Sequence, residues 1–371
     1  MKRIVYIVMI ITLMGSCKKP YSPPVSESVN TILVVEGTIA VGANTENRFL
    51  LSRLRPLQDT TLNDPEPGAR VTIESQSGQT WNLAEQSAGT YLSTISLPLN
   101  VKYRLKVQTQ NGRQYETDFL DVKATPPIDS VTWEEPHDLN IFVHTHDPSN
   151  NTKYYRWEYT ETWEYHAFYD SNLDFVNGQI IFLQPADYKY ACYSSASSGS
   201  IIINNTTALT EDVISYQPIL TLPNASPKAS YKYSILVRQV GLPEDAYKFW
   251  NILRKNTELT GTLFDPQPSQ LPGNIRSLTD PAEKVIGFVS AGIVAEKRIF
   301  IRNADLPGWP QMPAEDSVCK VIYAVDPIQF LNQDTSYGPA YFLSGALMIA
   351  KKNCMDCRRR FGSLTRPPFW Q

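Results

Sequence analysis

Residues 68–95 read GARVTIESQSGQTWNLAEQSAGTYLSTI, and this stretch decides the fold class. Apolar side chains recur at every second position in three short runs, which is the period of a β-strand with one buried face. The runs are separated by QSGQ and SAG, where glycine supplies the backbone freedom that a tight turn requires. The stretch therefore predicts three consecutive strands joined by short turns.

The same pattern extends outward through residues 31–123. Seven short runs carry it, and QNGR, which separates the last two, contains Asn111-Gly112, the dipeptide most typical of a two-residue hairpin. Seven strands at this spacing are typical of a sandwich, so we predict an immunoglobulin-like β-sandwich here. The seven runs are ILVVEG, RFLLSRL, ARVTIES, QTWNLAE, TYLSTIS, YRLKVQT and RQYETDFLDV.

The segment KATPPIDSV marks a domain boundary, because two prolines interrupt the strand pattern and the pattern restarts after them. Residues 124–371 are predicted to form a second β-rich domain with one inserted helix near residues 243–259. In that helix Pro243 suits the first turn, Glu244 suits the helix dipole, and Phe249 belongs to an apolar stripe. The predicted fold class is therefore all-β, or mainly β. The strand-like runs of this region are SVTWEE, LNIFVHTH, YYRWEYTETWEY, QIIFLQ, YKYSILVRQV, KVIGFVS, KRIFIRN and CKVIYAV.

The N-terminal residues 1–16 have the three parts of an export signal: a basic start, an apolar run, and the small pair Gly15-Ser16. The sequence LMGSC that ends this segment resembles the lipobox of bacterial lipoproteins, which makes Cys17 the predicted lipidated N-terminus. The alternative is an ordinary secreted protein in which Cys17 is incidental. Residues 17–30 contain three prolines and no apolar periodicity, so they are predicted to be an extended tether.

Charge and cysteine content narrow the classes of partner and compartment. The formal net charge is −3, with Lys+Arg 34 and Asp+Glu 37, so the chain has no basic field that would hold nucleic acid. Four cysteines follow Cys17, and an even number in an exported protein predicts two disulfides within the second domain. Either Cys354 pairs with Cys357, or the tail is stapled back to Cys192 and Cys319. We favour the stapled form, because closing a long loop removes more unfolded-state entropy.

Six segments together resemble the domain-of-unknown-function family 4249, whose members are predicted lipoproteins of Bacteroidota. The resemblance implies an outer-membrane lipoprotein that is often encoded beside a TonB-dependent receptor, in a family with no established reaction. Surface lipoproteins of this phylum often carry acidic residues after the cysteine, whereas Lys18 and Lys19 follow Cys17 here. Two locations of the anchored protein, the cell surface and the periplasmic face of the outer membrane, are therefore both compatible with the sequence. The segments are ILVVEGTI, GARVTIES, YRLKVQTQNGRQYETDF, AYKFWNILRKNTELTGTLFDPQPSQLPGNI, DPAEKVIGFVSAG and CMDCRRRFGSLTRPPFW.

Residues 154–169, YYRWEYTETWEYHAFY, form the most aromatic stretch of the chain. Alternation along a strand places Tyr155, Trp157, Tyr159, Trp163 and Tyr165 on one face, and we expect this face to be core. The functional alternative is an aromatic platform for a sugar or a peptide near the end of the strand. Its residues would be Trp163, Tyr165, Phe168 and Tyr169.

Patterns with catalytic or metal-binding chemistry are scarce. The sequence has no Gly-x-Ser-x-Gly elbow, His-Glu-x-x-His or phosphate-binding loop, so we predict neither a catalytic residue nor a cofactor. His144 and His146 share one face of a strand, but no third ligand has a telling spacing, so we expect solvent-facing histidines and no metal site. Glu158, Glu161 and Glu164 could serve as a glycosidase acid or base, yet acids along a strand usually form a solvated face.

The sequence therefore favours a lipid-anchored outer-membrane protein that acts by binding. The favoured function is an accessory module of a TonB-dependent β-barrel receptor in nutrient capture or uptake. The alternatives are an exported carboxylate-dependent hydrolase and a structural or adhesive surface protein. The expected partners are membrane lipid, through Cys17, and the barrel.

Overall fold

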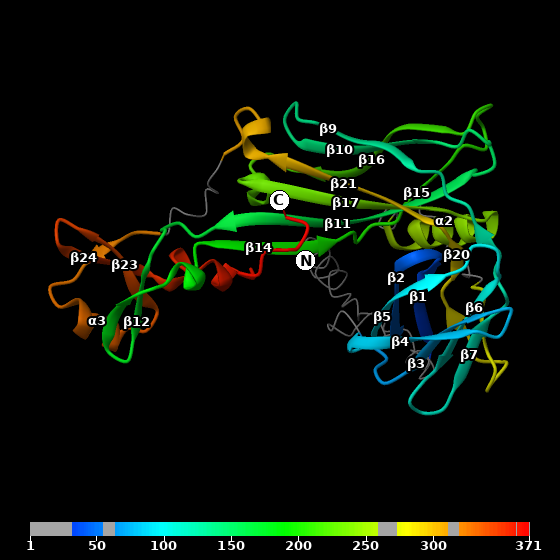
Figure 1. The fold of residues 1–371 in the computed structure, drawn as a ribbon, viewed down its shortest axis with the longest axis horizontal. Helices are drawn as coiled ribbons and strands as arrows, with labels where there is room; N and C mark the ends of the chain where they lie inside the picture. The colour runs from blue at the N-terminus through cyan, green and yellow to red at the C-terminus, as the bar shows by residue number, and fades with distance from the viewer. Residues whose placement is uncertain (1–31, 55–63, 259–272, 311–318, 361, 371) are drawn as a thin grey trace, which may run out of the picture.

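The computed structural model describes residues 32–54, 64–258, 273–310, 319–360 and 362–370, and its mainly β architecture confirms the predicted fold class (Figure 1). The signal peptide, Cys17 and the tether lie outside the described residues. Figure 1 shows three parts: a central pair of sheets, an N-terminal β-domain that lies beneath one end of these sheets, and a small distal module beyond their other end.

The N-terminal β-domain is one continuous sheet of eleven strands, in the order β18-β7-β6-β3-β4-β5-β2-β1-β20-β8, with β19 beside β1. Consecutive strands are mostly joined by tight turns, as in the β6–β7 hairpin, where Gly112 has a φ of 85°. The immunoglobulin-like arrangement stays a prediction. Eight strands come from the predicted region: β1 (Leu33–Ala40), β2 (Gly42–Arg53), β3 (Arg70–Ser75), β4 (Thr80–Ser87), β5 (Thr90–Leu97), β6 (Tyr103–Gln108), β7 (Gln114–Thr117) and β8 (Val122–Lys123).

Three strands of this sheet come from beyond the predicted boundary at residue 123. β18 (Ile275–Ser277) pairs with β7, while β19 (Val285–Ile286) and β20 (Ser290–Gly292) pair in parallel with β1. A Cβ at Gly287 would lie 2.2 Å from the carbonyl oxygen of Val35, so glycine is required for this close approach. The N-terminal domain is therefore discontinuous. The strand KVIGFVS was expected in the second domain because periodicity identifies a strand without identifying its partner.

The core of this domain follows the alternation in its strands. Inward positions such as Val71, Ile73, Leu105 and Val107 are almost completely buried, and Val289 from the late segment completes the cluster. Buried tyrosines donate their hydroxyl hydrogens to fixed acceptors, as buried phenols require.

Two sheets pack face to face in the central part. One has the order β16-β10-β9, and the other β14-β11-β17-β21 with β15 also beside β11. Tyr155, Trp157 and Tyr159 of β11 lie in the core between them, as the alternation predicted. The buried Trp157 indole donates to Gln239 Oε1 at 2.8 Å. The strands are β9 (Ile128–Glu134), β10 (Leu139–His146), β11 (Tyr154–His166), β14 (Ala191–Ser197), β15 (Ile202–Asn205), β16 (Val213–Leu222), β17 (Lys232–Gly241) and β21 (Val294–Arg302).

The helix α2 (Glu244–Glu258) lies where the sequence predicted it. Its apolar stripe of Ala246, Phe249 and Trp250 packs against Ile203 of β15 and Val240 of β17. The helix thus covers one end of the central sheets, where they meet the N-terminal domain (Figure 1).

The distal module, residues 167–190 and 319–360, is built from an insertion between β11 and β14 together with the C-terminal part of the chain. Its core contains Leu173, Leu331, Leu347 and Ile349. The elements are β12 (Leu173–Val176), β13 (Gln179–Phe182), β22 (Ile322–Tyr323), α3 (Pro327–Gln333), β23 (Tyr337–Leu343) and β24 (Ala346–Lys351). Short 3-10 turns lie at Pro185–Asp187, Pro227–Ala229, Asn303–Asp305, Lys352–Cys354 and Cys357–Arg360.

Candidate functional site

Two disulfides attach the C-terminal part of the chain to the rest of the molecule. Cys192 in β14 is bonded to Cys357, and Cys319 is bonded to Cys354. This is the stapled arrangement that the sequence analysis favoured, and Cys354 and Cys357 do not pair with each other. Beyond Cys357, Ser363 forms two backbone hydrogen bonds with Tyr193 of β14. The tail is therefore held along the edge of the central sheet.

The four aromatic residues predicted as a ligand platform do not form one cluster, because Trp163, Tyr165 and Tyr169 pack in three different places. Trp163 packs against the central core, Tyr165 against the Cys192–Cys357 disulfide, and Tyr169 against Tyr341 of the distal module. The Tyr165 hydroxyl donates to the carbonyl of Cys357, and that of Tyr169 donates to the carbonyl of Cys319 at 2.9 Å. Phe168 meets the edge of the Tyr169 ring. Tyr165 and Tyr169 thus bind the C-terminal part of the chain itself.

A buried carboxylate that the sequence analysis expected on a solvated face lies beside Trp163. Glu161 is 3% exposed, and it accepts hydrogen bonds from Lys228 Nζ and from the Tyr233 hydroxyl, the latter at 2.9 Å. The Lys228 ammonium also lies 4.7 Å from the centre of the Trp163 ring. Burial, together with the nearby carboxylate, raises the pKa of the Tyr233 hydroxyl well above its ordinary value. This cluster therefore carries a satisfied charge within the core, which suits a structural role.

The histidines of β10 are engaged with neighbouring side chains. His144 Nε2 lies 2.8 Å from the Thr132 hydroxyl, and His146 Nδ1 lies 2.8 Å from Asp129 Oδ2. The Asp129 carboxylate raises the pKa of the exposed His146. Among the residues that the structure describes, no three His, Cys, Asp or Glu side chains gather as metal ligands would. The expectation that a zinc site is absent stays a prediction for the chain as a whole.

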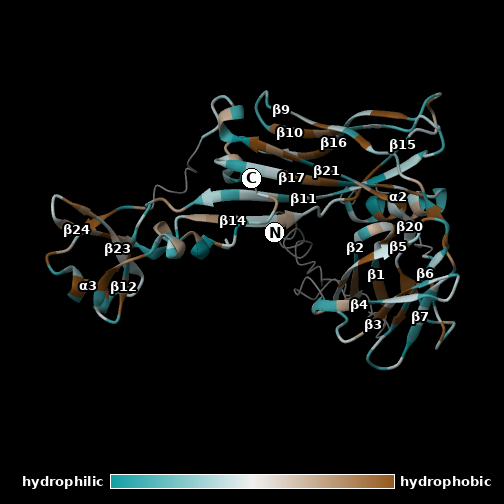
Figure 2. Ribbon diagram, in the orientation of Figure 1, coloured by the Kyte–Doolittle hydropathy of each residue, from teal (hydrophilic) through white to brown (hydrophobic). Residues whose placement is uncertain are grey.

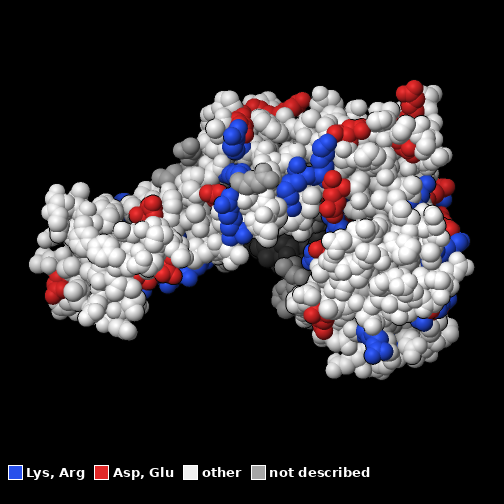
Figure 3. All heavy atoms as spheres, in the orientation of Figure 1, with Lys and Arg blue, Asp and Glu red and all other residues white. Residues whose placement is uncertain are grey.

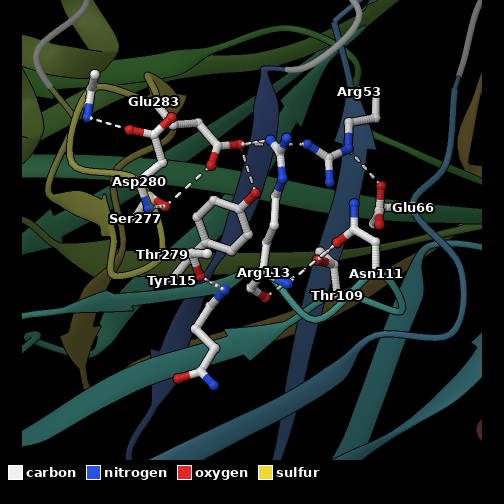
Figure 4. A network of polar contacts seen from close by, with 12 residues as sticks. Arg53, Glu66, Thr109, Asn111, Arg113, Tyr115, Ser277, Thr279, Asp280 and Glu283 are labelled. Carbon is white, nitrogen blue, oxygen red and sulfur yellow. Dashed lines mark hydrogen bonds and ion pairs between the residues drawn. The ribbon is translucent and has the colours of Figure 1, made fainter.

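A network of polar contacts lies in the N-terminal domain around Glu283 (Figure 4). The Glu283 side chain is 5% exposed. Its Oε1 accepts from the Tyr115 hydroxyl at 2.7 Å and from Arg113 at 2.8 Å, and its Oε2 accepts from Ser277 at 3.1 Å. Arg53 approaches the same carboxylate, at 3.9 Å. Burial, followed by the hydrogen bond to Glu283, raises the pKa of the Tyr115 hydroxyl.

The partners of Glu283 show what this network does. Arg53 belongs to β2, Tyr115 belongs to β7, and Arg113 directly precedes β7. The Glu283 carboxylate therefore connects the segment that contains β18 and β19 to two early strands. Both carboxylate oxygens are already engaged by donors, which leaves the group poorly suited to act as an acid or a base. The network instead holds β18 and β19 against the N-terminal strands.

The exposed surface of the distal module has a different character, because it presents large apolar side chains to solvent. Six of them define what we call the distal apolar surface: Phe182, Tyr323, Val325, Ile328, Phe342 and Leu343, whose exposed fractions run from 44% for Ile328 to 93% for Val325. Between residues 321 and 350 the only charged residues are Asp326 and Asp334. Figure 2 shows apolar residues throughout this module, and Figure 3 shows few charged side chains on the face turned to the viewer.

Local sequence explains why these side chains point outward. β23 and β24 are joined by Ser344 and Gly345, which both have positive φ, as in a two-residue hairpin turn. This tight turn leaves Phe342 and Leu343 at the tip of the hairpin. Val325 precedes α3, whose first turn is capped by the Asp326 carboxylate accepting from Gln329 N at 2.9 Å. The cap fixes the loop that exposes Val325.

The sequence of residues 18–298 matches the family model described as Domain of unknown function (DUF4249). The chain belongs to the DUF4249 family. No curated protein matches it. The DUF4249 match covers the N-terminal domain, α2 and most of the central strands, whereas β22 to β24 and α3 lie after its last residue. The C-terminal segment CMDCRRRFGSLTRPPFW, which contributed to the resemblance, therefore lies outside the matched range.

The sequence of this DUF4249 protein carried a signal for the distal surface that periodicity alone did not reveal. Residues 321–350 combine two acidic residues, no basic residue and many large apolar ones, which is an unusual composition for an exposed segment. A search for long segments of low charge would have found it. In the described part of the chain no helix is both long and apolar enough to cross a bilayer.

Proposed function

We propose that this DUF4249 protein is a lipid-anchored accessory protein of the outer membrane that binds a β-barrel receptor through its distal apolar surface. The observation that carries the proposal is the group of six exposed apolar side chains on one small module, five of them within residues 321–350, where only Asp326 and Asp334 are charged. Exposed large apolar side chains gathered on one part of a protein mark a candidate site of association. The alternative of an exported hydrolase lacks such support, since Glu161 and Glu164 are engaged in structural contacts and Glu158 pairs with Arg156.

The rest of the proposal comes from the N-terminal sequence and the family resemblance. Acylation of Cys17 would confine the protein to the membrane surface, where even a weak contact gains from raised effective concentration. The partner class, a TonB-dependent barrel in nutrient capture or uptake, is what the resemblance implies. An apolar surface in a segment of low charge suits a partner recognised at short range by close packing, because long-range steering requires charge.

The test is co-purification from cells that express the lipoprotein and the adjacent barrel gene. Mild detergent and a C-terminal tag should recover the barrel with the wild-type protein. The double variant Phe342→Ser, Leu343→Ser should recover at least roughly tenfold less barrel, since two large apolar side chains are no longer buried in the contact. The matched control is Leu99→Ser, Leu209→Ser, because both leucines are 53% exposed and lie outside the distal module.

Two outcomes would reject the proposal. One is equal recovery of the barrel by the distal variant and by the control variant, with both folded by circular dichroism. The other is a mature N-terminus, read by mass spectrometry, that carries no acyl group on Cys17. The first outcome contradicts the proposed docking surface, and the second contradicts the proposed lipid anchor.

A further inference from the structure

A shallow groove of about 330 Å³ opens between the two sheets of the central part. One wall is β15 and the other is β16, which follow each other in the chain but belong to different sheets. The last turns of α2 close one end, where Arg254 and Glu258 line the groove. Side chains of Ile201 and Leu220, each half-buried, supply apolar lining.

Both walls are strand edges. β15 is hydrogen-bonded to β11 on one side, and β16 to β10 on one side, and no other described strand pairs with either. An edge strand presents main-chain N–H and C=O groups at the spacing of another strand. Pro218 has no N–H to donate, and the N–H of Ile201 is bonded to Glu258. The other main-chain groups of the two edges lie at the spacing of a polypeptide backbone.

A bulge shapes the β16 wall. The register with β10 shifts between Val143 and Thr145, and Tyr216 adopts a φ of 54°, which bulky residues rarely do. Next to the bulge, Gln217 Oε1 accepts from the Asn204 side chain at 2.8 Å, which ties the two walls together. The groove thus has a fixed width at this point, which favours a preformed site.

Arg254 supplies the positive charge of the groove, whose lining also contains the acidic Glu258. Its guanidinium donates to Asn251 at 3.2 Å, and no ion pair joins it to a carboxylate of the described residues. Glu258 lies one turn further along α2, but its carboxylate accepts from the backbone N–H of Ile201 at 2.7 Å. An arginine that lines a groove without a carboxylate partner can form charge-assisted hydrogen bonds to an anionic ligand.

We propose that this groove binds an extended peptide segment bearing an acidic side chain, with its backbone on a strand edge and its carboxylate on Arg254. Peptides bind strand edges in this way, with main-chain hydrogen bonds for affinity and alternate side chains for specificity. Ile201 and Leu220 contact the apolar side chains of the segment. The site goes beyond the proposed docking function, since it shares no residue with the distal apolar surface and needs neither anchor nor barrel.

The test begins with a library of displayed random linear peptides, selected on the immobilised full mature chain in which Cys17 is replaced by serine. Enriched peptides should alternate apolar and polar residues and contain Asp or Glu. Synthesised with a fluorescent label, they should bind Arg254→Gln about tenfold more weakly, the effect of one charge-assisted hydrogen bond. The matched control is Lys255→Gln, which removes the same charge from an exposed position of α2 outside the groove lining.

A second variant keeps the test valid if Arg254→Gln is unstable. Ser200→Trp places a large side chain at an exposed position of the lining and should abolish binding without disturbing the core. The proposal is overturned if no peptide is enriched on the wild-type chain relative to Ser200→Trp. It is also overturned if enriched peptides bind Arg254→Gln as tightly as Lys255→Gln, or if the groove mediates a dimer that Ser200→Trp dissociates.

Discussion

Glu164 lies where the C-terminal tail returns to the central sheet. One carboxylate oxygen is 2.8 Å from His166 Nε2, and the other accepts from the indole of the buried Trp370 at 3.1 Å. The hydrogen bond with His166 lowers the pKa of Glu164 below 4.5, and although burial opposes this, the Trp370 contact adds to it. A single ionised side chain therefore connects β11 to the last residues of the described chain.

The pH dependence of stability should reveal this contact. Because the folded-state pKa of Glu164 is lowered, its contribution is complete above the unfolded value near 4.5 and is lost as pH falls through the folded value. At pH 7, Glu164→Gln should lower the free energy of unfolding by about 1 kcal/mol, and the difference from wild type should shrink as pH falls below the unfolded value. Urea unfolding of both proteins across this range measures it.

The control for this prediction is Glu158→Gln in the same strand, whose carboxylate is 45% exposed and pairs with Arg156. Its effect should be under about 0.5 kcal/mol at pH 7, as for a surface ion pair. A Glu164→Gln difference that stays constant from pH 7 to pH 3 would contradict the assignment.

At this scale the sequence predicted the buried aromatic face of β11 but misplaced Glu161. Strand alternation places Glu161 on the same face as Tyr159 and Trp163, so this face could be predicted from the sequence. The burial of Glu161 could not be predicted, because it depends on Lys228 and Tyr233, which lie elsewhere in the sequence and donate to its carboxylate. A buried acid is tolerated only with such partners, and a linear pattern does not show them.

The elements of the distal module are held by the two disulfides in different ways. Cys319–Cys354 closes a separation of 35 residues within the module, whereas Cys192–Cys357 closes one of 165 and connects the module to β14. The chain-entropy model assigns about 4 and about 5 kcal/mol to these closures. The long bridge therefore decides whether the module stays attached to the central sheets.

Hydrogen exchange should separate the two bridges. Cys192→Ser, Cys357→Ser should raise amide exchange in the tail, in β14 and throughout the distal module, and leave the N-terminal domain unchanged. Cys319→Ser, Cys354→Ser serves as the comparison, with faster exchange confined to β22, β23 and β24. If both double variants gave the same exchange pattern, the bridges would not have separate roles.

Sequence predicted some elements well and missed others for identifiable reasons. α2 and the Asn111-Gly112 hairpin were readable, because an apolar stripe or a turn dipeptide defines each locally. α3 has only seven residues, too few for a helical period to show, and β23 contains Gly338 and Pro339, which weaken a strand pattern. QIIFLQ and CKVIYAV correctly predicted β13 and β22, but the distal module was not recognised as a separate unit, because its elements are short and stabilised mainly by one another.

At the scale of the molecule, the N-terminal domain depends on chain that is synthesised much later. Ile275, Val289 and Ala291 belong to its core, and Glu283 holds its polar network together. The family and most of the strands were predicted correctly, although RQYETDFLDV divides into β7 and β8, and the boundary at residue 123 left these late residues in the second domain. Parallel pairing of β1 with β19 and β20 is a long-range contact with no local signature.

A fragment experiment tests this dependence. Residues 31–123 alone should fail to fold, giving poorly dispersed NMR spectra and no cooperative unfolding, since β1 and β7 lose their neighbours. Joining residues 273–292 through a glycine-serine linker should restore a cooperative transition. The same linked fragment with Glu283→Leu is the control and should be less stable, because Arg113 and Tyr115 lose their acceptor. A well-folded 31–123 fragment would show that the late strands are dispensable.

Because the N-terminal domain is discontinuous, its sheet is completed only after the late strands have been synthesised. Asp118 beside β7 and Arg276 in β18 form an ion pair although 158 residues separate them. At roughly 5–20 residues per second, the ribosome needs about 8 to 30 seconds to make the intervening chain. Throughout that interval the strands of residues 31–123 lack the neighbours that complete their sheet, and such an incompletely folded segment is what a holdase chaperone recognises.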